Sequence, residues 1–155
     1  MRALRQCGLE ASGLEVDRLE IAEGLFEEVR DHVRLTDGTF PLPLKDRSFA
    51  SVVATEVLEH IEGLTVAVEE IMRIADSEIF VTVPDASAIP ALFPHAVVPW
   101  HLLEGSHLNF FSAVALESLF RPAFEVVARY RFGRVVVNGT VTFTSLALRL
   151  RRVQP

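Results

Sequence analysis

The chain has 155 residues, of which 50% are apolar and 23% charged, the composition of a globular domain large enough to bury a core. A net charge of −6 argues against a nucleic-acid-binding surface, and the apolar runs are too short to span a membrane, so we expect neither nucleic acid nor membrane among its partners. Cys7 is the single cysteine and residues 1–15 do not resemble a signal peptide, which together predict a cytoplasmic protein without a disulfide framework.

The first third of the chain mixes helical and extended patterns. Residues 1–7 have the apolar spacing of the end of a helix, and residues 9–16 and 32–35 are predicted strands. Between the strands, Asp17 and Glu20 have the spacing of a capping box at the start of a helix. This part of the chain therefore predicts two strands joined by a helix.

The middle of the chain predicts a strand, a helix and a second strand. Residues 49–54 form a short apolar run with β-branched members, which is typical of a buried parallel strand. A helix follows at about 62–75, and apolar residues alternate along a strand at 77–83. Ligands of open α/β sheets bind beyond the carboxyl ends of the strands, so Thr55 stands where a ligand is expected.

The last third predicts a long connection, a helix and a hairpin. Residues 84–111 form a connection of the length usual for lids and binding loops. A helix is expected at 112–120, capped by its first residue. Strands are expected at 124–132 and 140–150, and their short linker, 133–139, makes them antiparallel neighbours. The alternation of strands and helices predicts an α/β fold with a mostly parallel sheet and an antiparallel edge hairpin.

One segment resembles a known family. LPLKDRSFASVVATEVLEHI is similar to the LPF-x-D-x-SFD-x-V…VLEH segment of class I S-adenosylmethionine-dependent methyltransferases, above all the set that includes the quinone-biosynthesis methyltransferases. The resemblance continues through EEIMRI, IFVTVP and GSHLNFFS and covers roughly residues 1–148. It implies S-adenosylmethionine as cofactor, a small-molecule methyl acceptor, and a Rossmann-like sheet of seven strands, of which this chain supplies six.

The family's first strand and its Gly-rich loop have no counterpart in the sequence. No two of the 8 glycines stand one residue apart, so the chain has no GxG with which a backbone could approach the cofactor closely. We therefore expect a single, N-terminally truncated methyltransferase domain over residues 1–155, in which strands 9–16 and 49–54 keep unpaired edges that favour self-association or complementation. Whether such a chain is an active enzyme stays open, and the alternative is a non-catalytic remnant that binds a partner or serves as a scaffold.

The resemblance places two cofactor contacts after the first two strands of the chain. Glu15, with Val16 beside it, corresponds to the acid that accepts hydrogen bonds from both ribose hydroxyls, although a surface glutamate is an equal alternative. Asp37 and Gly38 stand where the family holds the adenine amino group, and a plain Asp-Gly turn explains them equally well.

A third cofactor contact is implied at Ala54 and Thr55, which end the strand whose backbone touches the methionine portion in the family. The aspartate of the family's SFD element is Ala50 here. Methyl transfer requires few catalytic side chains, because the methyl group on the sulfonium of S-adenosylmethionine is already activated and the protein mainly aligns the reactants. The lack of a strong catalytic motif therefore does not argue against this function.

His60 in VLEHI is the candidate catalytic residue, because a histidine titrates near neutral pH and can act as general base on a hydroxyl. The simpler interpretation is a helix-start histidine bonded to nearby backbone. Glu56 and Glu59 are expected to be solvated acids that suit the N-terminal end of a helix dipole.

GSHLNFFS corresponds to an element near the substrate mouth of the family. The acceptor pocket is therefore predicted from His107 and Asn109 together with Trp100 and His101 of the same long connection. No metal site is expected, because His60, His101 and His107 do not fall at the i, i+4 spacing of a helical metal motif.

Overall fold

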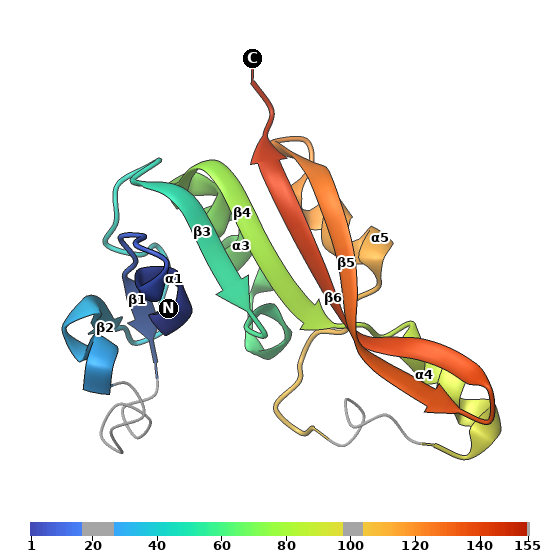
Figure 1. The fold of residues 1–155 in the computed structure, drawn as a ribbon. Coiled ribbons are helices and arrows are strands. Elements are labelled where there is room, and N and C mark those ends of the chain that lie inside the picture. The colour runs from blue at the N-terminus through green and yellow to red at the C-terminus, as the bar shows by residue number, and fades with distance from the viewer. Residues whose placement is uncertain (17–26, 98–103, 155) are drawn as a thin grey trace. The chain divides into compact units, whose positions relative to one another are not determined.

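The computed structural model describes residues 1–16, 27–97 and 104–154 (Figure 1). The chain divides into two compact units, Met1–Pro41 and Leu42–Pro155, which are described separately. No helix among the described residues is long and apolar enough to cross a membrane.

The first unit holds two short parallel strands. The register pairs Gly13 with Val33 and Glu15 with Leu35, so both carboxyl ends lie at one edge. The strand expected at 9–16 is confirmed but shorter, while the capping box at Asp17 and Glu20 lies outside the described residues. The elements are α1 (Arg2–Gln6), β1 (Gly13–Glu15), the 3₁₀ helix η1 (Glu27–His32) and β2 (Val33–Leu35).

Helix α1 ends at Gln6, and Gly8 closes it two residues later. The N–H of Leu9 donates to the carbonyl of Leu4 at 3.1 Å, and the N–H of Gly8 donates to that of Arg5 at 2.9 Å. Gly8 has a φ of +81°. This is the hydrogen-bond pattern of a Schellman motif, which favours glycine at its left-handed position.

The second unit is a four-stranded sheet with helices on one face. Its strands run in the order β3-β4-β6-β5. β3 and β4 are parallel, whereas β4 with β6 and β6 with β5 are antiparallel, so this sheet is mixed rather than mostly parallel. The elements are β3 (Phe49–Thr55), η2 (Leu58–His60), α3 (Leu64–Ile74), β4 (Ala75–Pro84), α4 (Ala88–Leu92), η3 (Phe93–His95), α5 (Ala113–Phe120), β5 (Phe124–Val137) and β6 (Thr140–Arg152).

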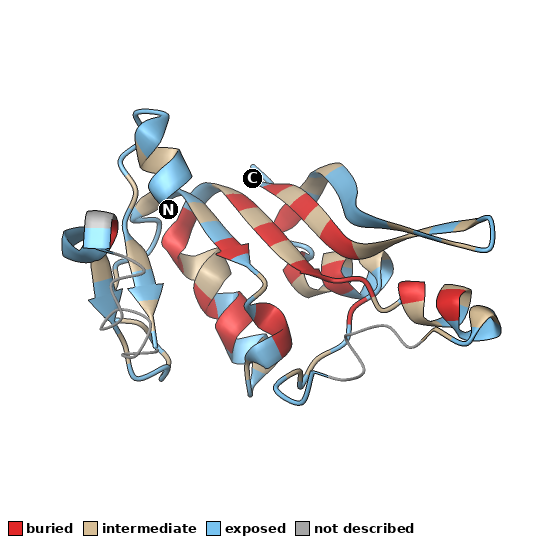
Figure 2. Cartoon of the chain, turned by 60° about the horizontal axis from the view of Figure 1, so that its bottom comes forward, coloured by how far each residue is buried: buried red, intermediate tan, exposed pale blue. Residues whose placement is uncertain are grey.

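The core lies between this sheet and helices α3 and α5. Buried and partly exposed residues alternate along the central strands, as Figure 2 shows. The alternation expected at Ile79, Val81 and Val83 of β4 is confirmed, since all three are at most 1% exposed. On α3, Val68 is buried as expected. The buried side chains of β6 that join this core are Leu146, Leu148 and Leu150.

The hairpin is confirmed, but its strands are longer than expected. Asn138 and Gly139 form the turn with φ values of +47° and +81°, the left-handed pair that a two-residue type I′ turn requires. Most of the expected linker is therefore strand, including Gly133. A Cβ at Gly133 would meet the Oγ1 of Thr144 at 2.2 Å, so glycine serves close strand approach there. The cap of α5 is confirmed, because the Oγ of Ser112 accepts from the N–H of Ala115.

Strands β1 and β3 each have one partner among the described residues. β1 pairs with β2 within the first unit, and β3 pairs with β4 within the second. The sequence suggests that the other edges support self-association or complementation, which stays a prediction.

Candidate functional site

The first predicted group of cofactor residues lies at one edge of the β1–β2 sheet. Glu15 ends β1, and its Oε1 accepts a hydrogen bond from the N–H of Val16 at 2.7 Å. The N–H of Thr36, just after β2, donates to the carbonyl of Glu15 at 2.9 Å. The parallel register therefore brings the Glu15 carboxylate and the turn that carries Asp37 to the same edge.

Asp37 is engaged in its own turn. Its Oδ1 accepts hydrogen bonds from the N–H of Thr39 at 3.0 Å and from the Oγ1 of Thr39 at 2.7 Å. These bonds, above all the one from the hydroxyl, lower the pKa of Asp37. Gly38 follows with a φ of +77°, as the Asp-Gly turn interpretation requires. The carboxylate is thus ionised, exposed and fixed in direction at the carboxyl edge.

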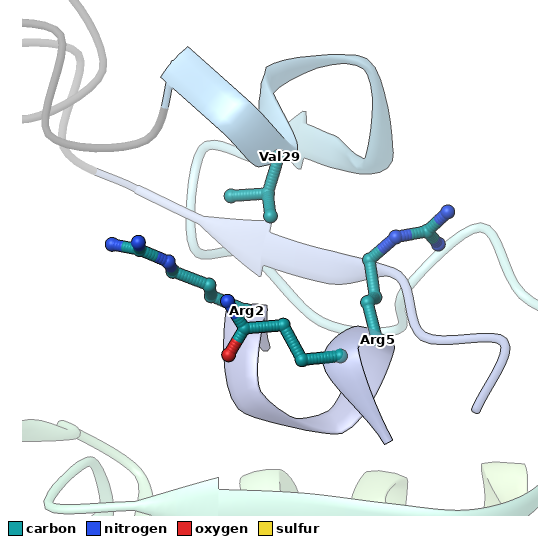
Figure 3. A pocket seen from close by; sticks show the side chains of 4 residues that line it. Arg2, Arg5 and Val29 are labelled. Atoms are coloured by element: carbon teal, nitrogen blue, oxygen red, sulfur yellow. The ribbon is translucent and has the colours of Figure 1, made fainter. Parts of the chain in front are cut away.

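A shallow hollow in the same unit is lined by Arg2, Arg5, Gln6 and Val29 (Figure 3). Arg5 donates from Nη1 to the carbonyl of Ala11 at 2.9 Å, which ties α1 to the following loop. None of these lining residues was predicted to bind the cofactor, so the hollow does not support the predicted cofactor site.

The second predicted group lies at the carboxyl end of β3. Ala54 is buried beside Val81 of β4, while Thr55 is exposed beside Thr82. The next residue, Glu56, has a φ of +51°, which is unusual for a side chain with a Cβ. Thr82 holds it there: its carbonyl accepts the Glu56 N–H at 3.0 Å, and its Oγ1 donates to Glu56 Oε1 at 2.7 Å. Strained backbone of this kind concentrates at functional sites.

The residues after β3 differ from expectation. Residues 58–60 form the short 3₁₀ helix η2, and the α-helix begins later, at Leu64. The prediction that Glu59 is solvated is wrong, because its side chain is 1% exposed. Neither carboxylate oxygen of Glu59 has a hydrogen-bond partner within the described part of the chain. Burial raises the pKa of Glu59, and the nearby charge of Glu56 adds to this.

The backbone N–H of His60 donates to the nearby carbonyl of Val57 at 3.0 Å, as the simpler interpretation suggests, but its imidazole contacts a distant loop. Its Nδ1 lies 3.2 Å from the carbonyl oxygen and 3.1 Å from the Oγ of Ser106, 46 residues away. Its Nε2 lies 3.8 Å from Oε1 of Glu59. The ring of His107 meets that of His60 edge-on, with centroids 4.8 Å apart. Two elements far apart in sequence therefore meet at η2.

Asn109 fastens this loop to η2. The N–H groups of Leu108 and Asn109 both donate to the carbonyl of Glu59, at 2.7 and 3.0 Å. The side-chain amide of Asn109 donates to the carbonyls of Leu58 and Ile61 at 2.9 and 2.8 Å. Asn109 was predicted for the acceptor pocket, and in this geometry it positions the backbone around Glu59.

The structure describes only two of the four residues predicted for the acceptor pocket. His107 and Asn109 lie beside η2, while Trp100 and His101 lie outside the described residues. Sequence reasoning missed Ser106 and the burial of Glu59. The two motifs VLEHI and GSHLNFFS were both noticed, but nothing in either indicates that they contact each other.

Comparisons with known proteins agree with this fold. The family model described as "Methyltransferase domain" matches residues 2–78. A SAM-dependent methyltransferase from Archaeoglobus fulgidus is similar in structure, with a TM-score of 0.76 and 13% identity over 97% of this chain and 80% of that one. The magnesium protoporphyrin IX methyltransferase ChlM from Synechocystis PCC 6803, solved with bound SAH, has a TM-score of 0.68 and 14% identity over 97% of this chain and 68% of that one.

A third similar structure is one chain of a Haloferax volcanii complex that contains the Trm112 methyltransferase activator. Its TM-score is 0.75 and its identity 16%, over 99% of this chain and 77% of that one. No curated protein sequence matches this chain. The fold and the family match together define an α/β methyltransferase-like domain. Residues 2–78 match the methyltransferase-domain family, and the fold resembles that of SAM-dependent methyltransferases.

Proposed function

We propose that this chain binds S-adenosylmethionine and takes part in methyl transfer to a small-molecule acceptor. The observation that carries the proposal is the parallel register of β1 and β2, which places Glu15 and the turn of Asp37 at one carboxyl edge. Ligands of open α/β sheets bind beyond such edges.

The two acids suit the two polar parts of a nucleoside. Glu15 would accept hydrogen bonds from the ribose hydroxyls, since a carboxylate offers two acceptor oxygens at the spacing of a diol. Asp37, whose carboxylate is oriented by Thr39, would accept from the adenine amino group. Val16 and Gly38, the neighbours of these acids, would line the same nucleoside.

For the second unit taken by itself, we propose that the carboxyl end of β3, with Ala54 and Thr55, contacts the methionine portion of the cofactor. The cofactor supplies an activated methyl group on a sulfonium, so the protein's task is alignment of acceptor, methyl and sulfur. His60 would receive the proton of a hydroxyl acceptor at Nε2, because Nδ1 is engaged by Ser106 and the side chain is 40% exposed. The cofactor would give up its methyl group to the acceptor and leave as a neutral thioether, while His60 would hold the proton released by the acceptor.

Calorimetric titration of the full chain with S-adenosylmethionine tests this proposal. Glu15→Gln should weaken binding at least about tenfold, since about 1.4 kcal/mol corresponds to a factor of ten and two charge-assisted hydrogen bonds would be weakened. Glu10→Gln, an exposed glutamate of the same unit, is the matched control and should bind as the unchanged chain does. If the unchanged chain does not bind the cofactor, the proposal fails and the partner-binding module is favoured.

A further inference from the structure

We propose that Glu59, His60 and His107 form a binding site for a divalent transition-metal cation of the Zn²⁺ class. Each residue offers one ligand atom, and the three atoms lie within 4.8 Å of one another. All three belong to the second unit, so the site is built within one compact body. The inference concerns cation binding and does not rest on the proposed methyl transfer; while Nε2 of His60 holds a cation it cannot accept a proton, so the two roles of His60 exclude each other.

The donor set selects the class of cation. One carboxylate and two imidazoles match Zn²⁺ and its neighbours Co²⁺ and Fe²⁺ better than Mg²⁺ or Ca²⁺, which prefer oxygen ligands. Bonds of about 2.0–2.2 Å place two ligand atoms at most about 4.4 Å apart, so the side chains need close only slightly around the ion. Three protein ligands leave coordination positions free for water or for an oxygen of another ligand.

The strongest observation is the buried carboxylate of Glu59. It is 1% exposed, and neither oxygen has a hydrogen-bond partner among the described residues. Buried polar groups nearly always have partners, and an unpaired buried carboxylate is costly. The Nε2 of His60 lies 3.8 Å from Oε1 of Glu59, which is beyond hydrogen-bond distance. A cation between these atoms would give the Glu59 carboxylate the partner that it lacks among the described residues.

His60 is already oriented as a ligand. Its Nδ1 contacts the carbonyl and the hydroxyl oxygen of Ser106, at 3.2 and 3.1 Å. With the ring proton on Nδ1, the lone pair of Nε2 is left to face Glu59. Metal-binding histidines almost always use their second nitrogen in this way, which fixes the tautomer and the ring direction.

The backbone that carries the ligands is held on both sides. Two N–H groups of the 107–109 loop donate to the carbonyl of Glu59, and the amide of Asn109 fastens the carbonyls of Leu58 and Ile61. His107 is the residue just before these donors, so the bonds that fix η2 also fix the third ligand. The fold therefore sets the backbone positions of the ligands, and Ser106 orients the exposed ring of His60.

The charges around the site favour a cation. Oε1 of Glu104 accepts from the Oγ of Ser106 at 2.8 Å, and the same hydroxyl contacts Nδ1 of His60 at 3.1 Å. Glu59 and Glu104 thus place two carboxylates near the two imidazoles, and their negative charges favour a divalent cation.

Cobalt titration tests the site directly, because protein-bound Co²⁺ absorbs visible light. The chain should be free of a histidine tag, treated with a chelator, and carry Cys7→Ser, since Cys7 is an exposed thiol that binds metals by itself. We expect one equivalent of Co²⁺ to bind with a new visible absorption band, Zn²⁺ to displace it, and Mg²⁺ at the same concentration to leave it unchanged.

Ligand variants decide where the ion binds. His107→Ala and His60→Ala should each weaken Co²⁺ binding at least about tenfold, as loss of a metal ligand costs more than loss of its hydrogen-bonding partner. His95→Ala is the matched control, because His95 lies in the same unit and bonds to Thr140 at 2.8 Å, and it should bind Co²⁺ unchanged.

Glu59→Gln provides a readout that survives if a histidine variant fails to fold. Zn²⁺ should raise the melting temperature of the chain with Glu59 and leave that of the Gln variant unchanged. The inference is overturned if Co²⁺ and Zn²⁺ fail to bind, which would leave Glu59 and His60 as an ion pair, or if His60→Ala, His107→Ala and His95→Ala bind equally well.

Discussion

Two glutamates of the second unit are buried to a similar degree but have opposite surroundings. Glu59 in η2 is 1% exposed and Glu70 in α3 is 6% exposed. Both oxygens of Glu70 have partners: Oε1 accepts from the N–H of Leu42 at 2.6 Å and from Arg73 Nη2 at 2.7 Å, and Oε2 accepts from Arg73 Nε at 2.8 Å. The oxygens of Glu59 have none in the described part of the chain.

The pKa shifts follow from this difference. The Arg73 guanidinium holds the pKa of Glu70 below its usual range, whereas burial raises that of Glu59. Arg73 also reaches Asp46 at 2.5 Å, so the Glu70 cluster fastens α3 to the chain before β3. The comparison teaches that burial alone does not assign a role to an acid. Glu70 is paired and stabilises the fold, whereas the buried charge of Glu59 has no partner among the described residues, and a bound ligand would provide one.

The largest expected effect is at Glu70. Glu70→Gln keeps the volume but removes the charge from three hydrogen bonds, and it should lower the free energy of unfolding by about 2 kcal/mol, discounted because Arg73 stays partly exposed. Urea denaturation at pH 7 measures it. A change below about 0.5 kcal/mol would contradict the structural role of this cluster.

The pH dependence of this loss has a definite sign. Because the folded-state pKa of Glu70 is lowered from 4.5, its stabilisation is present above pH 4.5 and disappears as pH falls through the lower folded value. The gap between the unchanged chain and Glu70→Gln should therefore be widest near neutral pH and shrink below pH 4.5. Urea midpoints for the two chains from pH 3 to 7 would check this, and a gap that widens on acidification would contradict it.

The next effect in size concerns the loop that holds Glu59 in place. Asn109→Ala removes two hydrogen bonds to the carbonyls of Leu58 and Ile61 and should cost about 1.5 kcal/mol of unfolding free energy. Hydrogen exchange should show faster exchange at the N–H of Leu108, which donates to Glu59. If exchange at Leu108 is unchanged, the amide of Asn109 does not position this loop.

Glu59 should respond in the opposite direction to Glu70. Glu59→Gln removes a buried charge without a partner, so it should raise the unfolding free energy by about 1 kcal/mol at neutral pH in the absence of metal. Because the folded pKa of Glu59 is raised from 4.5, ionisation of this carboxyl group lowers the free energy of unfolding as pH rises through the folded value. The stability gained by the Gln variant should therefore vanish below pH 4.5. Denaturation with a chelator present measures both, and a destabilised Gln variant would show that Glu59 has a protein partner.

The sequence predicted much of the second unit because its signals are local. Alternating apolar residues placed β4, and Ser112 capped α5 as expected. The hairpin linker was predicted too long, at 133–139, because Gly133 resembles a linker residue, whereas the turn itself is the pair Asn138 and Gly139.

The candidate site was harder to predict because it depends on contacts across the chain. His60 and His107 were both singled out, but their meeting depends on a bond between residues 46 apart. Glu59 was expected to be solvated because an acid at a helix start usually is, and the sequence does not show that the 107–109 loop bonds to its backbone carbonyl. The carboxyl-edge residues Glu15 and Asp37 came from a resemblance, and their shared edge follows from strand pairing.

The smallest expected effect tests whether the Ser106 hydroxyl orients His60 without contributing to the stability of the fold. Ser106→Ala removes the hydroxyl that contacts His60 Nδ1 at 3.1 Å but leaves the carbonyl contact at 3.2 Å. Because Ser106 is exposed, stability should change by less than about 0.5 kcal/mol. Co²⁺ affinity should fall by less than about tenfold, since the carbonyl still orients the ring. Ser118→Ala, an exposed serine whose Oγ donates to a backbone carbonyl at 2.7 Å, is the control and should not change affinity. Equal Co²⁺ affinities of the two serine variants would contradict an orienting role for the Ser106 hydroxyl.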